Sequence, residues 1–73
     1  MSPEKMVYMT NQIAKFFRTQ PEASRIENIA AHLSDFWEPR MLEKLYVHVD
    51  GGGAGLDALV VEAAKRIRQA KAA

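Results

Sequence analysis

The sequence predicts a single all-α domain of about four helices over residues 1–73. Apolar residues recur at three- and four-residue steps, which is the spacing of one helix face. Pro3, Pro21 and Pro39 divide these stripes, and proline suits the first turn of a helix but not its interior. The run Gly51-Gly52-Gly53-Ala54-Gly55 ends the third stripe, since glycine disfavours a continuing helix.

The first two helices follow from proline positions and stripe spacing. Ser2 is a hydroxyl cap, Pro3 opens the first turn and Glu4 lies near the positive end of the helix dipole. The first stripe then comprises Met6, Met9, Ile13, Phe16 and Gln20. Pro21 is expected to end that helix and start a second one, with Phe36 on the shoulder of its apolar face. The second stripe comprises Ile26, Ile29, Ala30, Leu33 and Trp37.

The third and fourth helices flank the glycine run. Pro39 opens a short segment with Met41 or Leu42, then Leu45 and Val49, at helical spacing. Alternation across residues 45–49 also suits a short strand, which would have no strand to pair with. Asp57 is expected to cap the last helix and the chain to fray from about Gln69. The fourth stripe comprises Leu56, Leu59, Val60, Ala63, Ala64 and Ile67.

Composition points to a small domain stabilised by a partner. A chain of 73 residues buries only about 60% of the surface that its unfolded form exposes. Eleven of its apolar residues are alanine, which gains little on burial, and there is no cysteine for a disulfide or a thiolate metal site. A net charge of +1 lacks the basic excess typical of nucleic-acid binding. No signal peptide or membrane-spanning stretch is visible, so we expect a cytoplasmic protein.

No residue pattern indicates catalysis or cofactor binding. The glycine run lacks the preceding strand and the following lysine with serine or threonine of a phosphate-binding loop. His32 and His48 lie on different helices without a carboxylate at ligand spacing, and Ser24 and Ser34 lack an evident base. We therefore assign no catalytic, cofactor-binding or metal-binding residue to this chain.

The junction Phe36-Trp37-Glu38-Pro39-Arg40-Met41 is the strongest candidate for partner contact. Proline suffices to form a helix corner, yet here it is joined by two aromatics and an arginine, residue types enriched at interface centres. The alternative is that Trp37 closes the core while Arg40 caps a carbonyl or pairs with a nearby glutamate. We predict that the junction connects the core to a partner through Phe36, Trp37, Arg40 and Met41.

Asn11 and Gln12 are amides within an expected helix, where asparagine is a mediocre helix former. One interpretation is exposure to solvent. The other is that Asn11 or Gln12 hydrogen-bonds the backbone of a neighbour across a partly buried surface, where leaving the amide unpaired costs about 1–3 kcal/mol. We include Asn11, Gln12 and the neighbouring Phe17 in the predicted partner interface.

Several segments together resemble the delta subunit of NAD-dependent formate dehydrogenases, from about Lys5 to Ala64. The most specific are Asn11-Gln12-Ile13-Ala14 with Phe16-Phe17, and the Phe36–Met41 junction. The other matching segments are Lys5-Met6-Val7-Tyr8-Met9-Thr10, Ile29-Ala30-Ala31-His32 and Gly55-Leu56-Asp57. The chain departs from the family at Ala58, often proline there, and at Leu42, often a basic residue.

This resemblance implies a small non-catalytic accessory subunit of a soluble cytoplasmic complex that interconverts formate and carbon dioxide with NAD. The large alpha subunit would hold a molybdenum or tungsten bis-pterin guanine dinucleotide and iron–sulfur clusters. The beta and gamma subunits would carry electrons to NAD through FMN and further clusters. This chain would hold no cofactor and would stabilise the large subunit or assist its assembly and cofactor retention.

Two other functions are open at this point. A chaperone could deliver cofactor to the large subunit and then leave, using the same aromatics as a permanent subunit. A small helical DNA-binding regulator could use the corner at Pro39 as a helix-turn-helix. Its recognition helix would offer only Arg40 and Lys44, offset by Glu43, so contact with nucleic acid is not expected.

Overall fold

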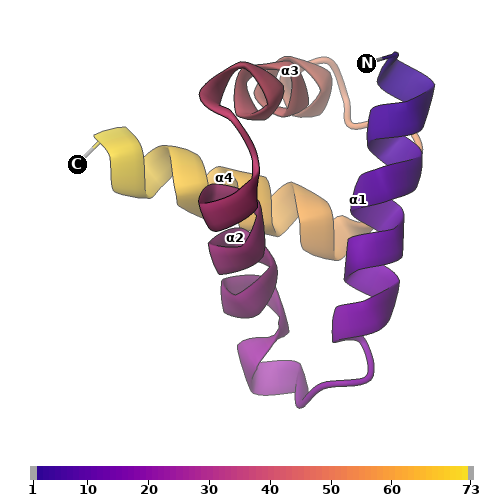
Figure 1. Ribbon diagram of the computed structural model, residues 1–73, viewed down its shortest axis with the longest axis vertical. Coiled ribbons are helices and arrows are strands. Elements are labelled where there is room, and N and C mark those ends of the chain that lie inside the picture. Colours follow the sequence, from indigo (N-terminus) through magenta and orange to yellow (C-terminus); the bar gives the residue numbers. More distant parts are fainter. Residues whose placement is uncertain (1, 73) are drawn as a thin grey trace.

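The computed structural model describes residues 2–72 and confirms the all-α prediction. Within this range there is no strand, and residues 45–49 are helical. One short 3₁₀ turn, η1, accompanies four α-helices (Figure 1). Their bounds are α1 Pro3–Phe17, η1 Glu22–Ser24, α2 Arg25–Phe36, α3 Pro39–Asp50 and α4 Ala58–Ala72.

The helices pack around α4. In Figure 1, α1 and α2 run antiparallel, α4 crosses behind them, and α3 lies across the end where α2 finishes. α4 packs most extensively against α2 and also against α3 and α1. The molecule measures 29 × 29 × 22 Å along its principal axes. No helix among residues 2–72 is long and apolar enough to cross a lipid bilayer.

Three helix starts agree with their sequence signals. The Ser2 hydroxyl accepts a hydrogen bond from the Lys5 backbone N–H at 3.2 Å. Pro39 is the first residue of α3. The Leu59 backbone N–H donates to Asp57 Oδ1 at 2.9 Å, so Asp57 caps α4 as expected.

The corner at Pro21 differs from the prediction. α1 ends at Phe17 rather than continuing to Gln20, and Pro21 precedes η1 rather than α2. The Arg25 guanidinium explains part of this, because it donates to the Gln20 and Arg18 carbonyl oxygens at 3.0 and 2.9 Å. Carbonyls left free at the end of α1 are thus satisfied by a side chain from the next helix.

The core contains mainly aliphatic residues, and its α2 and α4 members agree with the predicted stripes. Trp37 and Leu59 pack against it from partly buried positions. Its buried hydrophobic members are Met6, Ala14, Ile29, Leu33, Leu42, Leu45, Tyr46, Val60, Ala63, Ala64 and Ile67.

The predicted stripe on α1 is wrong by a rotation of the helix. The buried residues are Met6, Thr10 and Ala14, whereas Phe16 is 60% exposed and Met9 is 38% exposed. Thr10 fits the interior because its hydroxyl donates within the helix, at 3.0 Å from the Met6 and Val7 carbonyl oxygens. Thr10 and Ala14 therefore lie on the buried face, which the periodicity of large apolar residues does not detect.

α3 and α4 are joined by a polar cluster that the stripe analysis missed. Tyr46 is buried, and the Arg68 guanidinium carbon lies 5.1 Å from its ring centroid. Arg68 also pairs with Asp50 at 2.6 Å. This cluster lies close to Gln69, where fraying was expected, but α4 continues to Ala72.

Candidate protein-docking surface

The two aromatics of the junction have separate environments. Trp37 follows α2 in extended conformation, is partly buried and packs against the core. Phe36, the last residue of α2, is 75% exposed. Trp37 therefore packs against the core, as the alternative interpretation of the junction held, while Phe36 is the aromatic residue that is available to a partner.

Arg40 lies exposed in the first turn of α3. Among residues 2–72, none forms a hydrogen bond or ion pair with its guanidinium, so the alternative of a carbonyl cap or a glutamate pair is not observed there. No acidic residue lies in that first turn, whose backbone dipole disfavours a cation. The position therefore contributes little to this fold, and Arg40 is free to contact another molecule.

Met41 borders an apolar groove between α1 and α3, lined by Pro3, Met6, Met41 and Val47. The groove has a volume of about 470 Å³, and Ser2, Glu43, Lys44 and His48 complete its lining. This volume falls within the range of small-molecule sites. Its apolar lining, which includes two flexible methionine side chains, also suits a side chain from another protein.

A second apolar surface lies along the seam of α1 and α2. We call Phe16, Phe17, His32 and Phe36 the aromatic ridge. Successive ring centroids lie 5.1 Å apart for Phe16–Phe17, 6.1 Å for Phe17–His32 and 4.9 Å for His32–Phe36. Beside it, Gln12 and Ile13 join three ridge residues around a hollow of about 300 Å³. The ridge joins predicted interface residues from two helices that the sequence alone could not place together.

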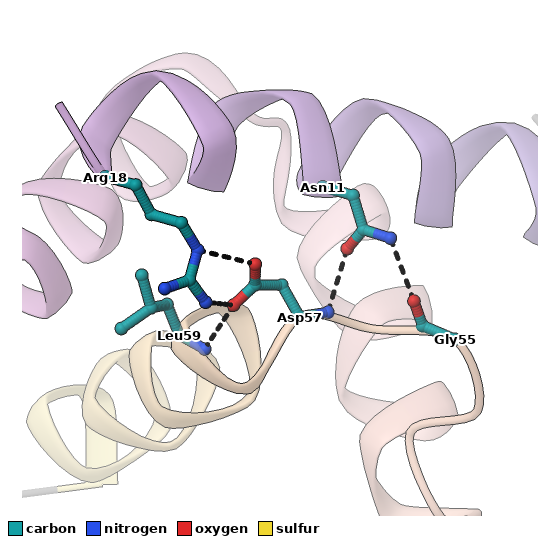
Figure 2. Close-up of polar contacts among 5 residues, drawn as sticks. All are labelled: Asn11, Arg18, Gly55, Asp57 and Leu59. Atoms are coloured by element: carbon teal, nitrogen blue, oxygen red, sulfur yellow. Dashed lines mark hydrogen bonds and ion pairs between the residues drawn. The ribbon is translucent and has the colours of Figure 1, made fainter.

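Asn11 and Gln12 have different roles although they are adjacent. The Asn11 amide donates to the Gly55 carbonyl oxygen at 2.8 Å and accepts from the Asp57 N–H at 2.9 Å (Figure 2). It therefore pairs with backbone, as one interpretation held, but the backbone belongs to its own chain. Gln12 is exposed beside the ridge.

Arg18 makes a further contact between the end of α1 and the start of α4. We call the contacts of Asn11 with Gly55 and Asp57 and of Arg18 with Asp57 the latch. The Arg18 guanidinium donates to both carboxylate oxygens of Asp57, at 2.7 and 3.2 Å (Figure 2). Burial alone would raise the pKa of Asp57, but hydrogen bonds from Arg18 and the Leu59 N–H, with the Arg18 charge, hold that pKa below its usual value. No sequence signal identified Arg18, because its partner is 39 residues away.

The histidines and carboxylates do not gather into a metal-binding set in the part of the chain described. Across residues 2–72, no three His, Asp or Glu side chains are close enough to hold one ion. His32 belongs to the ridge, and His48 Nε2 lies 2.8 Å from the Ala54 carbonyl oxygen. His48 therefore fastens the glycine-rich loop to α3.

Comparison with known proteins identifies the family. Residues 5–64 match the model of a family described as "NADH-dependant formate dehydrogenase delta subunit FdsD". No curated protein and no solved structure matches the chain. The matched range contains the ridge, the junction and the latch. The chain thus belongs to the family of NADH-dependent formate dehydrogenase delta subunits.

Proposed function

We propose that this protein is a non-catalytic accessory subunit of a cytoplasmic NAD-dependent formate dehydrogenase. In this proposal it docks on the large alpha subunit, stabilises it and assists its assembly and cofactor retention. Family membership supports the role of subunit. The observation that carries the docking role is the exposure of Phe16 and Phe36 on one connected ridge, together with an Arg40 guanidinium that has no described partner.

The implied cofactors are proposed for the other subunits. A molybdenum or tungsten bis-pterin guanine dinucleotide with iron–sulfur clusters would reside in the alpha subunit, and FMN with further clusters in the beta and gamma subunits. The residues of this chain do not fit an iron–sulfur cluster, because the chain has no cysteine to supply the thiolate ligands. The formate–NAD reaction would therefore use residues of the partners.

The DNA-binding alternative gains no support from α3. Its exposed residues include Glu43 beside Arg40 and Lys44, and its exposed large hydrophobic residue is Val47, at 69%. A helix that reads DNA presents donors to phosphates and base edges instead. A DNA titration at low salt provides the direct check, with no salt-sensitive binding expected.

Co-expression of the alpha, beta and gamma subunits with and without this chain tests the proposal. With it, we expect a complex that contains this subunit, a full complement of molybdenum or tungsten in alpha, and formate-dependent NAD reduction. Without it, we expect loss of the metal cofactor from alpha and a matching loss of activity. Equal metal content and activity in both preparations would contradict the role in cofactor retention. Stoichiometric co-purification distinguishes a permanent subunit from a chaperone that leaves.

A further inference from the structure

The aromatic ridge places two of the chain's three phenylalanines on the surface. Single exposed apolar residues are ordinary on a soluble protein. Here Phe16 and Phe36 are 60% and 75% exposed, come from different helices and are connected through Phe17 and His32. Such a connected aromatic surface is typical of the anchor of a protein interface.

We propose that the aromatic ridge is the anchor of this subunit on the large catalytic subunit, and that its occupant is an uncharged apolar helix of that subunit. This inference rests on the proposed function and adds the docking face and the chemistry of the contacting segment.

The charge distribution favours an uncharged protein segment. Neither the ridge nor Gln12 and Ile13 beside it carries a formal charge when His32 is neutral. The interhelical ion pairs of the described residues instead involve α4 or its capping residue: Arg18–Asp57, Arg66–Glu27 and Arg68–Asp50. A charged group buried against the ridge would lose water without gaining a counter-ion, and nucleic acid or an anionic membrane would require cations here.

The shape of the seam favours a helix. The ridge lies on α1 and α2, which run antiparallel (Figure 1). The hollow of about 300 Å³ beside the ridge can accept a side chain from a helix laid along the seam. Gln12 is exposed and His32 partly exposed at this hollow, so they can hydrogen-bond a polar group at the margin of the contact.

Binding of the full chain to the separately purified large subunit tests the inference. Phe16→Ser and Phe36→Ser should each weaken binding roughly 30-fold or more, the loss typical of an interface hot spot. Tyr8→Ser is the matched control, because Tyr8 is aromatic, lies on the same helix as Phe16 and is 66% exposed. It should bind as the wild type does, and circular dichroism should show unchanged helicity in all three variants.

Further variants test whether the segment bound to the ridge is uncharged, and whether the apolar groove between α1 and α3 is the binding surface instead. Phe36→Arg places a charge on the ridge and should abolish detectable binding, while Tyr8→Arg should not. Val47→Ser alters the apolar groove at a residue of similar exposure, 69%, and should leave binding unchanged.

Each contrary result has a distinct meaning. Wild-type affinity in the Phe16 and Phe36 variants, or a loss confined to Val47→Ser, overturns the ridge as anchor and leaves the proposed role as a subunit, which rests on family membership, intact. Self-association of the wild type that Phe36→Arg abolishes, measured by analytical ultracentrifugation, overturns the assigned occupant in favour of a second copy. Failure of the wild type to bind the large subunit removes the proposed function and this inference together.

Discussion

Adjacent side chains at the corner between α2 and α3 differ in what they contribute. Trp37 packs against the core, whereas Phe36 and Arg40 are exposed and Arg40 has no described partner. The chain changes direction between α2 and α3, since the backbone of Trp37 is extended and a new helix begins at Pro39, so the neighbouring side chains have different surroundings. Stability and docking can therefore be altered separately by substitutions only three residues apart.

Arg40→Ala should leave the free energy of unfolding within about 0.5 kcal/mol of the wild type, because a solvated side chain is removed. Trp37→Ala should lower it by about 3 kcal/mol, since a partly buried indole leaves the core. Urea titrations followed by circular dichroism check both values.

Arg40→Ala should also weaken binding to the large subunit by about 2 kcal/mol if the guanidinium is a buried hot spot. Wild-type affinity would remove Arg40 from the interface.

The hydroxyl of Tyr46 is buried and has no hydrogen-bond partner among the described residues. Burial raises the pKa of this phenol, Glu43 raises it further, and Arg68 opposes the rise. Tyr46→Phe should therefore be neutral or stabilise the protein by up to about 1 kcal/mol. Tyr8→Phe, at an exposed tyrosine, is the control; destabilisation specific to Tyr46→Phe would reveal a partner for its hydroxyl.

At the scale of elements, α1 and the loop before α4 are held by a contact that apolar patterns cannot predict. Gly55 has a φ of 80° and lies close to α1, where a Cβ would be 3.4 Å from Val7 Cγ1. Asn11 pairs with the backbone on both sides of Leu56, and Arg18 pairs with Asp57 (Figure 2). A helical amide and a glycine conformation together determine where α4 begins.

Asn11→Ala should destabilise the domain by about 1–2 kcal/mol, because two backbone contacts of its amide are lost. Gln12→Ala is a close control, since it removes an exposed amide from the next position of the same helix and should change stability by less than about 0.5 kcal/mol. Thermal unfolding of both variants at one pH gives the comparison. Equal stability of the two would mean that water replaces the Asn11 contacts at no net free-energy change.

The Asp57 end of the latch should make stability depend on pH. Because the folded-state pKa of Asp57 is lowered, its stabilising contribution is complete above the unfolded pKa, near the usual 3.8, and is lost as pH falls through the folded pKa. Asp57→Asn retains a capping side chain but cannot ionise. It should be less stable than the wild type at neutral pH by up to about 1 kcal/mol, as Arg18 is half exposed and solvent screens the pair.

This difference should shrink as pH falls below the unfolded pKa of Asp57, and the other carboxylates cancel in the comparison. Urea unfolding of both proteins, from neutral pH down to pH values below that pKa, measures the difference. A constant difference would show that the Arg18–Asp57 charge pair does not contribute to stability.

The sequence predicted the helices and the buried faces of α2 and α4, but it misjudged the buried face of α1. Proline, capping residues and glycine act over one turn, so they located Pro3, Pro39 and Asp57 as starts. The face of α1 was misjudged because periodicity follows large apolar residues, whereas the buried face holds the polar Thr10 and the small Ala14. The predicted interface residues were located on the structure but not tested by it. Their grouping into the ridge, through His32, required knowledge of how α1 and α2 pair.

The whole molecule combines an alanine-rich core with exposed rings, which argues for modest stability alone and greater stability in the complex. Ala14, Ala63 and Ala64 are fully buried, yet each contributes little apolar area. We expect the isolated chain to unfold below about 90 °C, the limit above which a domain is called hyperstable. A higher midpoint would contradict the dependence on a partner.

Binding should raise that midpoint with the logarithm of the ratio of the free partner concentration to its dissociation constant. A partner present at 100 times its dissociation constant adds about 2.7 kcal/mol to the folded state, and each kcal/mol shifts the midpoint of a domain this small by about 4–8 °C. Saturating large subunit should therefore delay unfolding of this chain by about 10 °C or more, as hydrogen exchange of α1 and α2 amides on heating can detect. Phe36→Arg should keep the midpoint of the free chain but lose the shift, because Phe36 is exposed and its substitution affects only the bound state. If the large subunit protects the Phe36→Arg chain as fully as the wild type, the gain in stability comes from another face.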